Sequence, residues 1–184
     1  SPLQMASVFA TIANSGQQCK PQSIESVTDR DENVLKEFAA DCKEVISPDL
    51  ANKTAALLTA SAGQYYTSTR LGDGRPFAAK SGTTDGHANT WLTGFTPSLA
   101  TSTWVGHGDN SSQEVSGVVI NGVYHSEIFG ETYVGQNIWA PYMTQALAGT
   151  PVEAVSNANI GATTPQRGAT PTPTPSASPT SNDH

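Results

Sequence analysis

Three strand-forming segments follow one another closely in the middle of this chain, at residues 77–81, 90–96 and 99–106. The second and third are rich in Thr, Trp and other strand-favouring residues, and only Thr96-Pro97-Ser98, a turn sequence, lies between them. Strands joined by so short a turn pair antiparallel. An antiparallel sheet is therefore predicted at the centre of the fold.

Helix signals lie on both sides of these strands. Ser1-Pro2-Leu3-Gln4 is typical of a capped helix start, and apolar residues at helical spacing follow it as far as Ser15-Gly16. Ser47-Pro48-Asp49-Leu50 is typical of the start of a second helix, which is predicted to end at Gly63. A third is predicted over residues 137–147, after a long Gly-rich and Ser-rich loop. Helices flanking an antiparallel sheet define an α+β fold.

The two cysteines, Cys19 and Cys42, bracket a charged segment. Two short strands are predicted inside it, at residues 23–27 and 34–38, around a turn. A disulfide closing this loop would contribute roughly 3 kcal/mol through the unfolded state. The spacing alone leaves open a second interpretation, two unrelated buried thiols, and no metal-ligand pattern accompanies the pair.

Composition changes near residue 150. Residues 150–184 are rich in Thr, Pro, Ser and Ala and nearly free of large apolar side chains. Such a segment cannot bury enough surface to offset its ordering entropy, so it is predicted to be a disordered or polyproline-like tail. Residues 1–149 remain as the folded domain.

Charge and hydropathy exclude two classes of partner. The formal net charge is −7, and the nine Lys and Arg residues form no basic cluster, which argues against nucleic-acid binding. The apolar runs are far shorter than the roughly 20 residues that a membrane span requires. Any targeting or anchoring segment is expected to lie outside this chain.

Lys80-Ser81-Gly82-Thr83-Thr84 joins a cation, hydroxyl groups and a glycine at the end of the first predicted strand. Such a cluster can hold an anionic acyl substrate. It matches the Lys-Thr/Ser-Gly element of penicillin-binding proteins and serine β-lactamases. A triplet of this kind arises by chance in roughly one chain in ten of this length, and the alternative for Lys80 is a solvated lysine on an edge strand.

Five blocks in the right order make the match specific. They are residues 1–16, 79–85, 89–97, 103–106, and a closing helix with residues 138–143 and 146–149. In this order they resemble the transpeptidase domain of bifunctional class A penicillin-binding proteins. The cysteine pair and the Thr-Pro tail resemble the actinobacterial branch of that family.

The resemblance implies a β-lactamase/transpeptidase-like fold and a serine D,D-transpeptidase that cross-links peptidoglycan. Its partners would be peptidoglycan stem peptides and β-lactams, and it would need no cofactor and no metal. It would work at the extracellular face of the cell membrane or in the cell wall, and an exported location favours the Cys19–Cys42 disulfide.

One departure from the family dominates the interpretation. The family acylates the serine of a Ser-x-x-Lys motif and uses a Ser-x-Asn motif beside it, and neither pattern occurs in this sequence. The chain is therefore expected to be the C-terminal part of a transpeptidase domain, with the missing N-terminal part as its partner. The isolated chain is expected to be inactive.

The resemblance assigns roles within the Lys80 segment. Lys80 and the Ser81 and Thr83 hydroxyls would hold the substrate carboxylate, and the Thr83 backbone N–H would donate to the oxyanion. Gly82 would let the substrate backbone approach the strand edge. Thr84 belongs to the predicted substrate-binding set and, with Asp85, would shape the strand exit.

Other chemistry-bearing residues are predicted to be structural or solvated. The aromatic residues of the strands are expected in the core or on a sheet face, the histidines have no ligand-spaced partner, and the remaining charges are expected in exposed loops. These residues are Trp91, Phe95, Trp104, His87, His107, His125, Arg70, Arg75, Asp109 and Glu127.

Two alternative functions stay open at this point. One is a non-catalytic, wall-associated binding module in which an inactive penicillin-binding fold recognises peptidoglycan. The other is a relative of the serine β-lactamases, which is disfavoured because the tail and the cysteine-bracketed insertion are unlike that branch.

Overall fold

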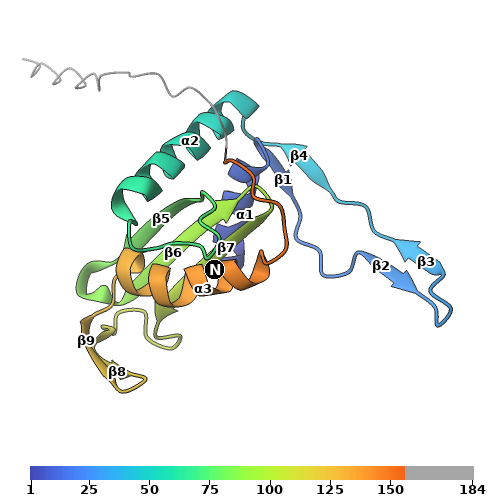
Figure 1. The fold of residues 1–184 in the computed structure, drawn as a ribbon. Coiled ribbons are helices and arrows are strands. Elements are labelled where there is room, and N and C mark those ends of the chain that lie inside the picture. Colours follow the sequence, from blue (N-terminus) through green and yellow to red (C-terminus); the bar gives the residue numbers. More distant parts are fainter. Residues whose placement is uncertain (156–184) are drawn as a thin grey trace, which may run out of the picture.

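The computed structural model describes residues 1–155. Its centre is an antiparallel sheet in the order β5-β6-β7, formed by β5 (Ala78–Thr83), β6 (Asn89–Thr96) and β7 (Leu99–Gly106) (Figure 1). Thr96 and Leu99 face each other across the predicted turn. The sheet expected from the sequence is confirmed, although β5 runs past Ser81 and takes in Gly82 and Thr83.

Helices cover both faces of the sheet. α1 (Pro2–Ala13) starts with the predicted capping box between Ser1 and Gln4. α2 (Pro48–Tyr65) lies against β5 and begins, as predicted, after Ser47. It continues past Gly63 because that glycine does not adopt the left-handed conformation that ends helices. The predicted α+β arrangement is confirmed.

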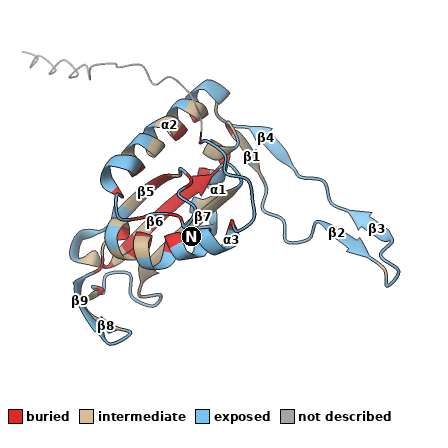
Figure 2. Cartoon of the chain, viewed as in Figure 1, coloured by how far each residue is buried: buried red, intermediate tan, exposed pale blue. Residues whose placement is uncertain are grey.

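Two apolar clusters lie on opposite sides of the sheet. Leu92 and Phe95 are an odd number of residues apart on β6, so their side chains point to opposite faces. Leu92 packs with Trp139 and Met143, whereas Phe95 packs with Phe9, with ring centroids 6.2 Å apart in an edge-to-face pair. Figure 2 shows buried residues concentrated on the central strands and on the helix surfaces that face them. Burial of Phe95 alone contributes roughly 1.5–3 kcal/mol.

The segment between the cysteines forms an arm that projects from the domain (Figure 1). Its outer part is a hairpin of β2 (Ser26–Thr28) and β3 (Val34–Glu37), close to the two predicted strands. At its base, β1 (Gln17–Cys19) pairs with β4 (Cys42–Glu44). These base strands were not predicted, because three-residue strands of polar residues carry no alternating pattern.

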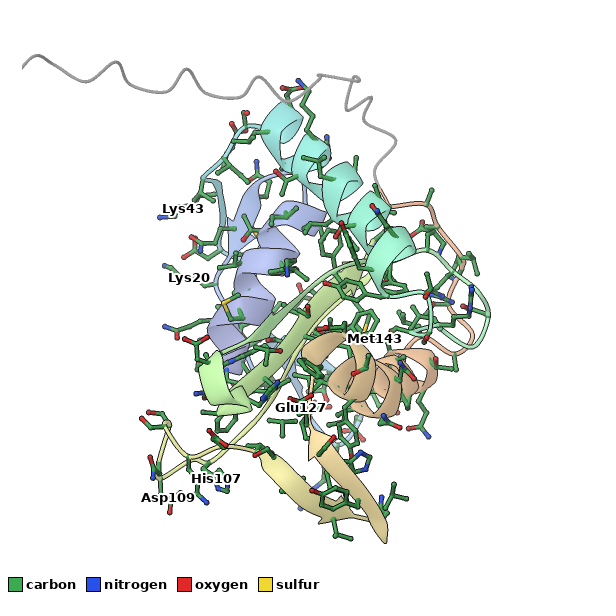
Figure 3. The ribbon with its side chains drawn as sticks, turned by 90° about the vertical axis from the view of Figure 1, so that its left-hand side faces the viewer. Lys20, Lys43, His107, Asp109, Glu127 and Met143 are labelled. Carbon is green, nitrogen blue, oxygen red and sulfur yellow. A yellow bond between two sulfur atoms is a disulfide. The ribbon has the colours of Figure 1, made fainter. Side chains whose placement is uncertain are left out.

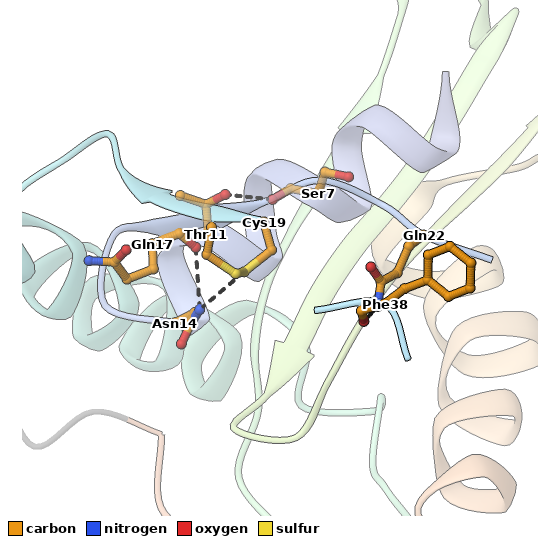
Figure 4. Close-up of a disulfide and its surroundings, with 8 residues drawn as sticks. Ser7, Thr11, Asn14, Gln17, Cys19, Gln22 and Phe38 are labelled. Carbon is orange, nitrogen blue, oxygen red and sulfur yellow. Dashed lines mark hydrogen bonds between the residues drawn. A yellow bond between two sulfur atoms is a disulfide. The ribbon is translucent and has the colours of Figure 1, made fainter. Parts of the chain in front are cut away.

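Cys19 and Cys42 form a disulfide at the end of the β1–β4 ladder (Figure 4). The interpretation as a bridge is thus confirmed over that of two unrelated thiols. Asn14, at the end of α1, donates its side-chain N–H to the Gln17 carbonyl and contacts the Cys19 sulfur at 3.8 Å. The bridge therefore fixes the base of the arm next to α1.

Replacing both cysteines by serine should lower the free energy of unfolding by about 3 kcal/mol, because the crosslink closes a loop with a sequence separation of 23. Urea denaturation of the wild-type and double-variant proteins measures the change. Single-cysteine variants should lose the same amount. An unchanged unfolding midpoint in the double variant would contradict the expectation.

The long loop predicted before the last helix contains regular structure. β8 (Ser116–Ile120) and β9 (Val123–Glu127) form a hairpin, followed by η2 (Gly130–Trp139) and α3 (Ala140–Ala146). The Asn121-Gly122 turn has φ values of 52° and 80° at its two residues, the combination that a two-residue hairpin needs. This dipeptide is the sequence signal that could have identified the hairpin.

The final helical region starts earlier than residue 137, the predicted position. η2 has wide π-type turns at its start, where the Val134 N–H donates to the Phe129 carbonyl at 3.1 Å. Its buried residues, including Val134 and Trp139, cover one face of the sheet. A π-type turn shifts the helical period, so the start of η2 does not show the α-helical spacing of apolar residues.

Arg75 is buried, which corrects the prediction of an exposed loop cation. Its side chain is 3% exposed, and its guanidinium donates to the Asp73 carboxylate, the Leu147 carbonyl and two oxygens of Thr150. Hydrogen bonds from Arg75 lower the pKa of Asp73 and keep its carboxylate ionised. Arg75 thus ties the loop before β5 to the chain that follows α3. Arg70 is exposed, as predicted.

Residues beyond α3 also pack against the domain. Thr150 is held by Arg75, and Val155 is 6% exposed in the cluster that contains Phe95. The packed chain therefore extends at least to Val155, beyond the boundary expected at residue 149. The rest of the predicted tail, residues 156–184, lies outside the described residues. Within residues 1–155, no helix has both the length and the apolar character needed to cross a membrane.

Candidate active site

The outer edge of β5 carries the residues of the Lys80 segment. Because β5 is the end strand of the three-stranded sheet, one side of it pairs with β6 and the other has no strand neighbour among residues 1–155. The pairing side is defined at the end of the strand, where the Thr84 N–H donates to the Asn89 carbonyl at 3.0 Å. Alternate residues of β5 must therefore direct their backbone groups to the outer side.

The hydrogen bond of the Ser81 N–H shows which backbone groups of β5 point away from β6. This N–H donates to the phenol oxygen of Tyr66, 2.8 Å away, rather than to β6. Backbone direction alternates along a strand, so the N–H and C=O of Thr83 point outward as well. Thr83 is exposed, and its N–H is thus open to a bound group at the strand edge.

Lys80 lies along the same edge. Its ammonium group donates to the Ser81 carbonyl, with 2.7 Å between nitrogen and oxygen, and the side chain is exposed. Both outward backbone groups of Ser81 are therefore satisfied, the N–H by Tyr66 and the C=O by Lys80. The ammonium retains further N–H groups, since lysine carries three donors.

The Ser81 and Thr83 hydroxyl groups each accept a hydrogen bond from the protein. The Ser81 oxygen accepts from the Tyr66 hydroxyl at 3.3 Å, and the Thr83 oxygen accepts from the Gly130 N–H at 3.4 Å. Because a hydroxyl has one hydrogen and two lone pairs, each of these groups keeps its own hydrogen for another acceptor. The edge therefore presents a cation and two hydroxyl donors, a set suited to a carboxylate.

Gly130 makes this arrangement sterically possible. A β-carbon on Gly130 would lie 2.2 Å from the Trp91 carbonyl oxygen and 3.0 Å from the Ser81 β-carbon. Only glycine lets η2 begin close enough to the sheet for its first N–H to reach Thr83. No sequence pattern marks Gly130 as part of the site, because it falls in a segment predicted as loop.

Gly82 differs from Gly130, because nothing inside the chain requires a glycine there. A β-carbon on Gly82 would contact only the Trp91 β-carbon, at 3.8 Å, and its φ is not in the left-handed region. Gly82 is exposed at the open edge of the sheet. The space beside it is thus available to a group from outside the chain.

Thr84 has a different environment from Ser81 and Thr83. Its hydroxyl accepts a hydrogen bond from the Asn89 N–H at 3.0 Å, across the connection between β5 and β6. Asp85 follows in η1 (Asp85–His87), a single turn in the same connection. These contacts agree with the expectation that Thr84 and Asp85 shape the exit of the strand.

The histidines are spread over separate surroundings. The His87 ring packs edge-on against Phe129, and its Nε2 atom is 4.0 Å from the Glu127 carboxylate. The His125 ring packs against Tyr133. Figure 3 shows His107 and Asp109 in the loop after β7 and Glu127 at the end of β9. Among residues 1–155, no three His, Cys, Asp or Glu side chains are grouped so that they could hold a metal ion.

The aromatic residues of the sheet are structural, as predicted. Phe95 is 1% exposed in the core. Trp91 and Trp104 are half-buried neighbours on one sheet face, with ring centroids 6.1 Å apart. The Trp104 indole N–H donates to the Asn89 side chain at 3.0 Å. These aromatics support the strand that carries the site.

The sheet with helices on both faces and a Lys-Ser-Gly-Thr strand at its edge is the architecture of a penicillin-binding transpeptidase. The family model described as the penicillin binding protein transpeptidase domain matches residues 1–122. The chain belongs to this family.

Curated relatives match most of this chain. The chain is 34% identical to penicillin-binding protein 2D of Bacillus subtilis over 82% of its length, which is 21% of that protein. It is also 34% identical to penicillin-binding protein 1A of Mycolicibacterium smegmatis, over 93% of its length and 22% of that protein. The chain thus spans about a fifth of the length of these relatives.

Solved structures give the same result. PonA1 from Mycobacterium tuberculosis aligns with a TM-score of 0.66 and 27% identity, covering 96% of this chain and 44% of that chain. Penicillin-binding protein 1A from Haemophilus influenzae has a TM-score of 0.62, covers 86% of this chain and 28% of that chain, and at 23% identity supports the fold alone. The family model, the Mycolicibacterium smegmatis relative and PonA1 together assign the chain to the transpeptidase domain of class A penicillin-binding proteins, of actinobacterial type.

Proposed function

We propose that this chain provides the substrate-binding strand of a peptidoglycan D,D-transpeptidase that works through a serine acyl-enzyme. The observation that carries the proposal is the outer edge of β5. There a cation, two hydroxyl donors and one outward backbone N–H come together at Lys80, Ser81 and Thr83. The membership of the penicillin-binding transpeptidase family supports this assignment.

The first task of the strand is to hold the substrate's carboxylate. A stem peptide ending in D-Ala-D-Ala carries this group beside the amide that is cleaved, and β-lactams carry a carboxylate in a comparable position. Lys80 provides the positive charge, and the Ser81 and Thr83 hydroxyls provide directed hydrogen bonds. Charge-assisted bonds of this kind are stronger and more directional than neutral ones.

The second task is to stabilise the oxyanion. When a serine oxygen attacks the penultimate D-Ala carbonyl, the carbonyl oxygen gains negative charge in the tetrahedral intermediate. The outward N–H of Thr83 is the donor that this chain offers to it. Collapse of the intermediate breaks the amide bond and releases D-Ala, and the amine of a second stem peptide then attacks the acyl-enzyme and frees the serine.

The nucleophilic serine and the second oxyanion donor belong, in this proposal, to residues outside the sequence. No Ser-x-x-Lys or Ser-x-Asn motif occurs in the chain. The outer edge of β7 has no strand partner within residues 1–155, so the sheet can be extended there by another segment. We assign both roles, supplying the serine with the second oxyanion donor and extending the sheet, to the N-terminal part of the same domain. The complete protein would act at the extracellular face of the membrane, anchored by a segment outside this chain.

Substituting Gly82 by Ala tests whether a substrate approaches β5 at this point. The variant should fold normally and be slightly stabilised, by about 0.4–1 kcal/mol, because the added methyl group has room within the chain and restricts the unfolded state. Acylation of the complete domain by a fluorescent penicillin should nevertheless slow by roughly tenfold or more, since the methyl group occupies the ligand's path.

Gly63→Ala is the matched control for Gly82→Ala. Gly63 is an exposed residue of α2, and a β-carbon there meets nothing within 4 Å. This variant should keep the wild-type rate of acylation. A Gly82→Ala domain that reacts as fast as the Gly63→Ala domain would contradict the proposed approach of the substrate.

A further inference from the structure

Tyr66 is a buried side chain whose hydroxyl group contacts the site directly. It caps the C-terminus of α2, where its N–H donates to the Ala62 carbonyl, and the residue is 4% exposed. Its ring belongs to the apolar cluster that also contains Leu71 and Ala79. Packing therefore holds the ring in place, and the phenol oxygen is the part that reaches Ser81.

The hydrogen bonds of the phenol have a defined direction. Its oxygen accepts from the Ser81 N–H at 2.8 Å, and the Ser81 oxygen lies 3.3 Å away as the acceptor of the phenol hydrogen. A phenol has a single hydrogen, so this pair of contacts uses it on Ser81. The hydrogen of Ser81 is then directed away from Tyr66 and remains available to an anion.

The same phenol also affects the backbone of the strand. Without it, the N–H groups of Ser81 and Thr83 would both point outward from the open edge as free donors. With it, the Ser81 N–H is satisfied, and Thr83 keeps the outward N–H that can meet a substrate carbonyl.

We propose that Tyr66 is a positioning residue of this transpeptidase site. It orients the Ser81 hydroxyl as a hydrogen-bond donor to the substrate carboxylate. This inference rests on the proposed function. A phenylalanine would fill the apolar cluster equally well, so packing does not account for the hydroxyl.

Tyr66→Phe in the complete domain tests the inference by comparing two ligands. One is a penicillin with a free carboxylate and the other is its neutral methyl ester. The variant should acylate about tenfold more slowly with the acid, the effect of losing about one oriented hydrogen bond, while its rate with the ester changes by less than about twofold. The acid-to-ester preference, which is the acylation rate with the acid divided by the rate with the ester, should therefore fall about tenfold.

Tyr65→Phe provides the matched control. Tyr65 is the neighbouring residue and is 66% exposed. Its variant should keep the wild-type preference, and thermal unfolding should show that both variants are folded. Equal slowing of the acid and the ester by Tyr66→Phe would show a purely structural role and overturn the inference.

Ser81→Ala keeps the inference testable if Tyr66→Phe does not fold. This variant removes the hydroxyl that Tyr66 orients and should lower the acid-to-ester preference by a similar factor. An unchanged preference in Ser81→Ala overturns the inference whatever happens at position 66. If the wild-type domain itself forms no adduct with penicillin, the proposed function fails, and this outcome is distinct from either result with the variants.

Discussion

The isolated chain should form no covalent adduct with a fluorescent penicillin, whereas a domain that also contains the Ser-x-x-Lys segment should be labelled. The binding groups on β5 cannot replace the serine that attacks and opens the β-lactam ring. Contacts to the substrate carboxylate and to the oxyanion accelerate acylation only when a nucleophile is present to attack the substrate. Denaturing electrophoresis of both samples after incubation with the penicillin measures the difference.

Controls separate chemistry from folding in this comparison. Circular dichroism should show that the isolated chain is folded, and labelling of the complete domain should be abolished by prior treatment with unlabelled penicillin. Labelling of the folded, isolated chain at a specific serine would overturn the assignment of the nucleophile to residues outside this sequence.

Substitution of Lys80 by Ala in the complete domain should slow acylation by penicillin on the order of a hundredfold, a loss comparable to that of a directly acting electrostatic group. The variant removes the positive charge from the outer edge of β5 and leaves the carboxylate with hydroxyl donors only. Stability should change by less than about 0.5 kcal/mol, because the side chain is exposed and makes one hydrogen bond, to the Ser81 carbonyl.

Lys43→Ala is the matched control for Lys80→Ala. Lys43 is also an exposed lysine on a short strand, β4, at the base of the arm (Figure 3). Its loss should affect neither acylation nor stability. Stopped-flow acylation rates and thermal unfolding distinguish the outcomes. If Lys80→Ala loses stability and acylation together, Lys80 supports the fold rather than the substrate.

Much of the fold was predictable because its signals are local. The capping residues Ser1 and Gln4, the helix start at Ser47 and the turn at Thr96-Pro97-Ser98 each act within a few residues, and each was found where predicted. The hairpin of β8 and β9 also had a local signal, Asn121-Gly122, but its strands lie in a Gly-rich and Ser-rich segment that resembles a loop.

The candidate site could be predicted from the sequence only where its residues are contiguous. Lys80 to Thr83 lie on one strand and form a recognisable motif, whereas Tyr66 and Gly130 reach the same strand from α2 and η2. No property of Tyr66 in the sequence distinguishes it from Tyr65, because the difference arises from which side of α2 faces β5. Arg75 was misjudged for the same reason, since its partners Leu147 and Thr150 follow it at a great distance along the chain.

The occupied backbone groups of Ser81 also decide how long a ligand the edge of β5 can accept. Another polypeptide that adds as a strand needs a series of free N–H and C=O groups along the edge. Tyr66 and Lys80 interrupt that series at Ser81. In the proposed function, a short peptide end needs only the Thr83 N–H, whereas a long strand from a second molecule would also need the backbone groups of Ser81. The contacts that shape the proposed site thus make this edge a poor template for strand addition.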